Sequence, residues 1–156
     1  MGERIPSEAG DFRQLLEAVS TPAELRELLH ADGVNDAVIA EFVQAAGVDD
    51  VLDRIFGLMG TRFVPGKAGG GTGTVQWNVT TPDGPRAYRL EIADGRATGG
   101  RGAPGKATVT LSMSLQSLLR LCAGELNGVT GVMTGKIKVS GDMMFGAKMQ
   151  GWFDYS

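Results

Sequence analysis

Apolar and polar residues alternate with a period of two along the second half of the chain, which is the pattern of half-buried β-strands. The stretches that follow it are residues 74–80, 86–92, 106–112 and 135–141, and a glycine-rich stretch at 96–100 extends the series. Turn residues at Thr81-Pro-Asp-Gly-Pro85 and Asp94-Gly95 predict two consecutive hairpins. Because glycine has no side chain to pack, the strand at 96–100 is expected at an edge of the sheet.

Apolar residues at helical spacing occupy about the first sixty positions. The stripes are Phe12, Leu15, Leu16 and Val19, followed by Leu25, Leu28 and Leu29. Between them, Thr21 is the expected N-cap of a helix, with Pro22 at its first position and Glu24 closing a capping box. A weak repeat starting at Gly33 and Gly47 predicts two more helices, each capped by an Asn or Asp, and we expect Asp49 to cap the second.

Residues 65–73 are expected to be a flexible connection from helices to strands, without an apolar anchor. Further on, Ser114 or a neighbour is expected to start a helix that Gly124 ends, and residues 128–134 form a turn or one helical turn. Asp142 is the expected N-cap of a final helix. Its last residues, Trp152 and Phe153, are expected to cover the sheet or a cavity, because large exposed rings are a liability.

Three segments of this C-terminal part resemble the sterol carrier protein type 2 family of non-specific lipid-transfer domains. They are the helix end Leu121-Cys-Ala-Gly-Glu-Leu126, the block Met133-Thr-Gly-Lys-Ile-Lys-Val-Ser-Gly141, and the helix that follows it. The resemblance covers roughly residues 51–153. It implies an α+β fold, in which a five-stranded mixed sheet and its covering helices enclose an apolar tunnel for fatty-acyl or sterol-like molecules. The expected division is a helical N-terminal extension, residues 1–46, and a sterol-carrier-like lipid-binding domain, residues 47–156.

Composition limits the partners and the location of the protein. A chain of 156 residues is long enough for one domain with a core. Its 15 basic and 18 acidic residues give a charge of −3 without a basic cluster, which argues against nucleic acid as a partner. No segment has the pattern of a signal peptide or transmembrane helix, and the last residues lack a Ser-Lys-Leu peroxisomal signal. We therefore expect an intracellular, cytoplasmic protein.

Few residues are suited to metal or nucleophile chemistry. His30 and Cys122 are the only histidine and the only cysteine, so one chain cannot form the usual tetrahedral zinc site. His30 is expected on the surface at a helix C-terminus, and Cys122 as a small buried hydrophobe. Gly100-Arg-Gly-Ala-Pro-Gly105 matches the dinucleotide fingerprint in letters, but it leads into a strand instead of a helix. No cofactor, metal or catalytic residue is predicted.

The inward side of the strands, together with the family's general pocket, gives a set of expected ligand-binding residues. They are Trp77, Leu90, Val109, Leu111, Leu119, Met133, Ile137, Met144, Phe145 and Met149. Methionines can adapt to ligands of different shape, and few polar anchors imply broad selectivity. Lys136 and Lys138 either form a solvated face or hold an anionic head group near the tunnel mouth.

The main hypothesis is the binding or carriage of a fatty-acyl, sterol-like or polyketide-like molecule. One alternative is an enzyme of the cyclase or isomerase type that shapes an apolar substrate in the same cavity. Its only hints are Tyr88 and Gln150, polar groups on otherwise apolar elements. Another alternative is an interaction module, in which the N-terminal helices dock on a protein partner or pair two chains as a homodimer.

Overall fold

The computed structural model describes residues 21–30 and 35–154. The expected stripe from Phe12 to Val19 lies outside these residues. The described part contains a mixed sheet of five strands in the order β3-β2-β1-β4-β5, with β1 and β4 parallel and the other neighbours antiparallel. The strands are β1 (Gly73–Thr81), β2 (Gly84–Ala93), β3 (Arg96–Arg101), β4 (Val109–Ser114) and β5 (Ile137–Gly141). The predicted five-stranded α+β fold is confirmed, and the glycine-rich strand β3 is an edge strand.

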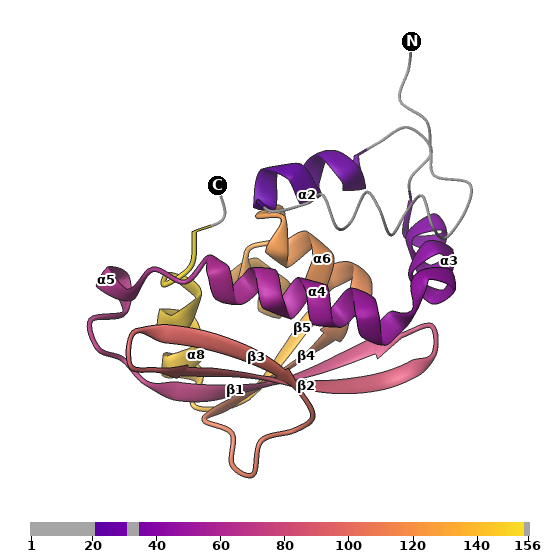
Figure 1. Ribbon diagram of the computed structural model, residues 1–156. Coiled ribbons are helices and arrows are strands. Elements are labelled where there is room, and N and C mark those ends of the chain that lie inside the picture. The colour runs from indigo at the N-terminus through magenta and orange to yellow at the C-terminus, as the bar shows by residue number, and fades with distance from the viewer. Residues whose placement is uncertain (1–20, 31–34, 155–156) are drawn as a thin grey trace.

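Helices lie on one side of this sheet, with the long helix α4 running across it (Figure 1). The helices are α2 (Pro22–Leu29), α3 (Asp36–Ala46), α4 (Val48–Thr61), α5 (Pro65–Ala68), α6 (Leu115–Cys122), α7 (Gly128–Met133) and α8 (Met143–Gln150). Along β1, the buried apolar side chains are Val75, Trp77 and Val79, as the alternation predicts. The core therefore lies between the sheet and the helices.

Two strands begin later than the alternation predicts. The pairing of β4 with β1 starts where Val109 meets Val75, so residues 106–108 precede the strand. The backbone N–H of Lys136 is used in the turn after α7, where it donates to the carbonyl of Gly131 at 2.8 Å. The first residues of both predicted strands thus belong to their connections.

Most predicted helix caps are present. The side chains of Thr21, Asn35, Ser114 and Asp142 accept a backbone N–H in the first turn of α2, α3, α6 and α8. The prediction for Asp49 was wrong. Helix α4 starts directly after Gly47, at a φ of 106°, and has no side-chain cap, while the Asp49 carboxylate accepts from Arg86 Nε at 2.9 Å.

The connection at residues 65–73 is more ordered than its composition suggests. It begins with the single-turn helix α5, which ends at Gly69 in the left-handed region with a φ of 57°. A Cβ atom at Gly71 would lie 2.5 Å from the ring of Trp152, and one at Gly73 would overlap the ring of Phe145. Glycine is needed here because side chains from the C-terminal segment pack against the backbone. The expectation of a connection without an apolar anchor was wrong.

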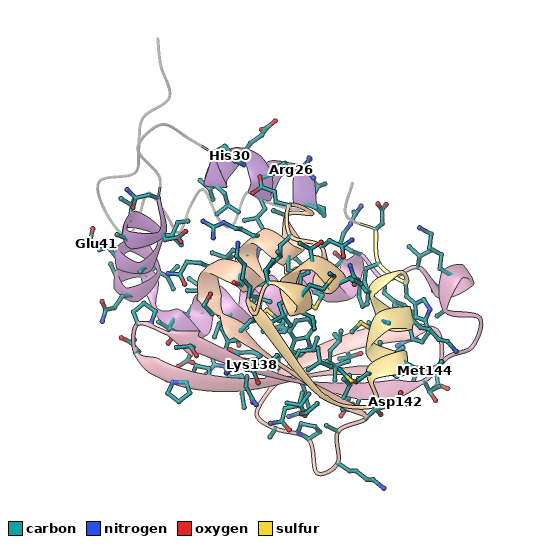
Figure 2. The ribbon with its side chains drawn as sticks, turned by 180° about the vertical axis from the view of Figure 1, so that it is seen from behind. Arg26, His30, Glu41, Lys138, Asp142 and Met144 are labelled. Atoms are coloured by element: carbon teal, nitrogen blue, oxygen red, sulfur yellow. The ribbon has the colours of Figure 1, made fainter. Side chains whose placement is uncertain are left out.

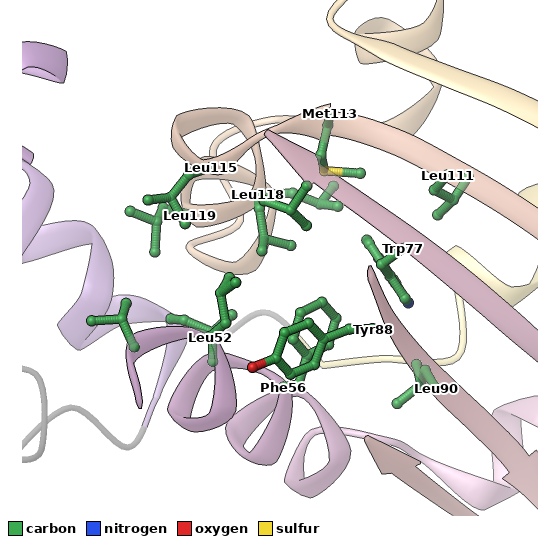
Figure 3. Close-up of a cluster of buried hydrophobic side chains, with 14 of the residues drawn as sticks. Leu52, Phe56, Trp77, Tyr88, Leu90, Leu111, Met113, Leu115, Leu118 and Leu119 are labelled. Atoms are coloured by element: carbon green, nitrogen blue, oxygen red, sulfur yellow. The ribbon is translucent and has the colours of Figure 1, made fainter. Parts of the chain in front are cut away.

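The part of the core under α4 is filled by aromatic and aliphatic side chains (Figure 3). The ring of Phe56 stacks on that of Tyr88 with centroids 4.6 Å apart, and it meets the Trp77 ring edge-on at 5.6 Å. Glycines bring α4 close to the edge strand. A Cβ atom at Gly60 would lie 2.7 Å from the carbonyl oxygen of Ala97, and one at Gly99 would lie 3.0 Å from the Phe56 Cβ. Gly60 of α4 and Gly99 of β3 therefore serve the packing of this helix on the sheet.

Candidate functional site

An apolar cavity of about 250 Å³ lies between the sheet and helices α2, α4, α7 and α8. Helix α4 contributes Ile55, Leu58, Met59 and, just past its end, Arg62, which share one helical face. Other residues of the wall include Leu25, Trp77, Leu111, Leu121, Cys122, Ile137, Val139, Met149 and Phe153. The N-terminal helix α2 thus completes a wall of the cavity through Leu25, which is buried.

The cavity opens where α7 and α8 meet. Four of its lining residues, Val129, Val132, Met133 and Met143, are between 38% and 82% exposed. These two helices are short and carry small residues that face the cavity, such as Gly128, Gly146 and Ala147. Glycine is needed at position 128 because a Cβ atom there would lie 2.5 Å from the side-chain oxygen of Gln150, so α7 and α8 pack closely beside the opening.

Half of the expected ligand-binding residues line this cavity. These are Trp77, Leu111, Met133, Ile137 and Met149. Leu90, Val109 and Leu119 do not, because they are buried in parts of the core that other side chains fill. Phe145 lies outside as well and packs edge-on against Trp152, with ring centroids 5.7 Å apart.

Met144 also lies outside the cavity. It is 71% exposed and sits on the outer side of α8 (Figure 2). The cavity-facing residues of this helix follow the spacing 143, 146, 147 and 150, so Met144 belongs to another face. Lys136 and Lys138 are exposed and do not line the cavity either.

The contribution of α4 and α2 to the cavity wall was not predicted. Ile55, Leu58 and Met59 recur at i, i+3 and i+4, a signal that was available for one apolar helix face. Leu25 was assigned to an extension, whereas Arg26 on the same helix donates two hydrogen bonds, of 3.0 and 2.8 Å, to the carbonyl of Ala123 beyond α6. Local patterns predict that a helix has an apolar face, but not which element that face covers.

Polar groups in the wall are few. Arg62 is the one charged side chain among the described residues that line the cavity. The indole N–H of Trp77 is buried and has no hydrogen-bond acceptor among the residues that the structure describes. Burial raises the pKa of the Cys122 thiol to about 12, which keeps it protonated at neutral pH. The surroundings of the cavity are therefore those of an apolar binding site.

Tyr88 lies in the filled part of the core. Its hydroxyl donates to Asp53 Oδ1 at 2.7 Å, and the Asp53 carboxylate also accepts from Arg101 Nε at 2.8 Å. The Arg101 guanidinium is the main reason why the pKa of Asp53 is lowered, with Tyr88 adding to the effect. Burial, followed by the hydrogen bond to Asp53, raises the pKa of Tyr88. This cluster ties α4 to β2 and β3 and does not reach the cavity.

His30 is on the surface, as expected, and its ring nitrogen Nε2 contacts the carboxylate of Glu125. Within residues 21–30 and 35–154, no group of three His, Cys, Asp or Glu side chains is arranged to hold a metal ion. No helix in this described part is long and apolar enough to cross a bilayer.

A one-sided mixed sheet with an apolar cavity beneath its helices defines an α+β fold with space for an apolar molecule. Residues 65–154 match the model of the SCP-2 sterol transfer family, and the chain belongs to that family. The resemblance found in the sequence is confirmed. Human stomatin-like protein 1 is 35% identical over 77 residues, which are 48% of this chain and 19% of that protein. The chain thus spans about a fifth of the length of this curated relative.

Solved structures show the same fold. Sterol Carrier Protein 2 Like 2 from Aedes aegypti superposes with a TM-score of 0.53 at 22% identity, covering 66% of this chain and 93% of its own. The palmitated form of that protein superposes with a TM-score of 0.53 at 24% identity, and the match covers 66% of this chain and 90% of that chain. The sec-alkylsulfatase Pisa1 from Pseudomonas sp. gives 0.59 at 20%, covering 93% of this chain and 28% of its own. At these identities the likeness concerns the fold alone.

Proposed function

We propose that the protein binds one long-chain apolar molecule reversibly in the cavity between α4, α7 and α8. The observation that carries this proposal is an apolar cavity of about 250 Å³ whose lining residues become exposed at one end. Pockets for small ligands usually measure about 300–1,000 Å³, so the cavity of about 250 Å³ is slightly smaller than that range. Removing an acyl chain from water contributes about 0.8 kcal/mol per buried CH₂ group.

The shape of the wall favours a flexible chain over a rigid ring system. Met59, Met133, Met143 and Met149 line the cavity, and their unbranched side chains can rearrange around a ligand. A fatty-acyl chain can in turn follow an irregular space, whereas a fused-ring sterol cannot bend. Among the ligands considered, a fatty-acyl molecule is therefore our choice. A palmitated form of the Aedes aegypti relative is consistent with it.

The two alternatives have less support. Gln150 lines the cavity, but Tyr88 is bonded to Asp53 in the filled core, so the two do not face a common substrate. Leu25 on α2 belongs to the cavity wall, which gives this N-terminal helix a role within the chain itself. Pairing of two chains, or docking on a protein partner, through the N-terminal helices stays a prediction.

Blocking the cavity tests the proposal. Val139 on β5 lines the cavity opposite Leu111 in the strand register, so Val139→Trp should fill the space and abolish uptake of a fluorescent fatty acid. Met144→Trp is the matched control, because it adds the same ring to the exposed side of α8. Circular dichroism would verify that both variants fold, and native mass spectrometry would detect bound lipid. Equal uptake by both variants, or none by the unmodified protein, would refute the proposal.

A further inference from the structure

Helix α2 closes one side of the cavity. It lies over α6 at the top of Figures 1 and 2, whereas α8 lies lower, beside the sheet. Thr21, Pro22 and Leu25 of α2 line the cavity, and Pro22 and Leu25 are buried, in contrast to the exposed lining residues of α7 and α8. The cavity is therefore open where α7 and α8 meet and stopped by apolar side chains at α2.

A polar contact fixes α2 in this position. The Arg26 guanidinium donates through Nε and Nη2 to the carbonyl oxygen of Ala123, at 3.0 and 2.8 Å. Ala123 is the C-cap of α6, where the helix dipole favours a positive charge. The contact of His30 with Glu125 is on the surface and adds less. Because an isolated helix of 8 residues is not stable in water, α2 depends on Arg26 and on the burial of Leu25 for its place.

The volume of the cavity limits how much of a ligand fits inside. An apolar cavity of about 150 Å³ can hold benzene, which corresponds to about 25 Å³ for each carbon atom. The cavity of about 250 Å³ therefore has room for roughly ten carbon atoms. A longer chain must leave its remaining carbon atoms at the opening between α7 and α8, where they gain less from burial.

We propose that Leu25 is a stop that sets the length of the apolar chain which the cavity buries. This assignment rests on the proposed function and adds a selectivity for chain length to it, independent of the head group of the ligand. The innermost carbon of the ligand lies against the Leu25 side chain, and Arg26 is the positioning residue that keeps α2 from yielding. Because α2 lies outside residues 65–154, the selectivity belongs to this chain and not to the segment that matches the family.

A series of unbranched 1-alkanols from 1-hexanol to 1-hexadecanol tests the assignment, because it varies the chain length and keeps the head group constant. The affinities can be measured by displacement of a fluorescent fatty acid. For the unmodified protein, the affinity should rise about fourfold for each added CH₂ group up to roughly ten carbon atoms and should level off beyond that length. An affinity that keeps rising fourfold per CH₂ group as far as 1-hexadecanol would overturn the stop.

Two substitutions at Leu25 should move the length at which the affinity levels off in opposite directions. Leu25→Ala removes about three carbon atoms from the wall and should lengthen the buried chain by about as many, whereas Leu25→Phe adds about three and should shorten it. Leu118→Ala is the matched control, because Leu118 is fully buried on α6 and does not line the cavity. It should lower the stability of the fold and leave the length limit unchanged. If neither Leu25 variant moves the limit, or the control moves it as far as Leu25→Ala does, Leu25 is not the stop.

Arg26→Met tests the positioning role. Without the two hydrogen bonds to Ala123, α2 should yield to long chains, so the affinity for 1-hexadecanol should rise by about 5-fold or more while that for 1-octanol stays nearly unchanged. Arg26→Lys keeps a charged donor for the same carbonyl and should restore part of the limit. A loss of affinity that is equal at all chain lengths would show that Arg26 supports the fold only.

Failure of the stop differs from failure of the cavity function. Binding of no alkanol at any length would refute the cavity function and this assignment with it. Binding that depends on chain length in the same way in the unmodified protein and in both Leu25 variants would overturn the stop and keep the cavity function.

Discussion

The two ends of the core have the same alternation of apolar residues along their strands, but side chains fill one end and the other end encloses a cavity. Under α4, strand β2 places Tyr88 and Leu90 against a helix of 14 residues that carries Phe56, and the space is filled (Figure 3). Near β5, the helices α7 and α8 have only 6 and 8 residues, and the space beside them stays open. Alternation along a strand decides that a residue is buried, whereas the covering helix decides whether it packs or lines a cavity.

The largest expected effect compares one leucine from each part. Leu90→Ala removes a fully buried side chain from the filled part and should cost about 2–5 kcal/mol of unfolding free energy. Leu111→Ala should cost less, roughly 2 kcal/mol or below, because Leu111 already borders empty space and has fewer atoms to lose. Denaturant unfolding of both variants measures the difference. Equal losses would mean that the cavity is filled in solution.

Alanine substitutions at two glycines of α4 should change the folding stability in opposite directions. A Cβ atom at Gly60 would lie 2.7 Å from the backbone oxygen of Ala97, so Gly60→Ala should push α4 away from β3 and cost about 1–3 kcal/mol. Gly57 has nothing within 4 Å of its Cβ position, and Gly57→Ala should stabilise the helix by about 0.5–1 kcal/mol. Thermal unfolding of the two variants checks the prediction. It is wrong if Gly60→Ala is also stabilising.

The loss of folding stability at low pH should depend on Asp53, whose carboxylate bonds to Tyr88 in the filled part of the core. The pKa of Asp53 is lowered in the folded protein, so its contribution is present above its ordinary pKa of about 3.9 and disappears as the pH falls through the lower folded value. Asp53→Asn should therefore be less stable than the unmodified protein at pH 7 and approach it at about pH 3. Denaturant unfolding over this range measures the convergence. If the difference in unfolding free energy between the two proteins stayed constant from pH 7 to about pH 3, titration of Asp53 would not be the cause of the acid sensitivity.

Tyr88→Phe removes the other hydrogen bond of the same carboxylate. It should cost about 1 kcal/mol at pH 7, because the buried ring stays in place and only the hydroxyl contact is lost. A double variant with Asp53→Asn should cost less than the sum of the two single changes, since both changes break the same contact. Strict additivity would show that the two groups do not interact.

The last comparison leaves the stability of the fold unchanged and concerns the reactivity of Cys122 in the cavity wall. With its pKa raised to about 12, the Cys122 thiol should react with iodoacetamide at pH 8 roughly 1,000-fold more slowly than an ordinary cysteine. A matched control is Ser140→Cys in a Cys122→Ser background, because residue 140 is exposed on β5. Mass spectrometry over time gives both rates. Similar rates would show that the thiol is open to solvent.

The sheet could be predicted from the sequence because alternation and turn residues are local. Trp77 and Ile137 point inward for that reason, and the hairpins follow from Pro82-Asp-Gly84 and Asp94-Gly95. The cavity could be predicted only in part. Leu90 and Ile137 have the same alternation and differ in the helix above them, which is a long-range property. Arg62 was not selected, because only the fold brings it to the end of an apolar wall.

The family-matched segment starts and ends at one place on the molecule. Val64 N donates to Trp152 O at 2.7 Å, and Asp154 N donates to Arg62 O at 2.9 Å, so residues 62–64 and 152–154 run side by side. A segment whose two ends are adjacent can be inserted into a surface loop of a host protein without pulling the host apart.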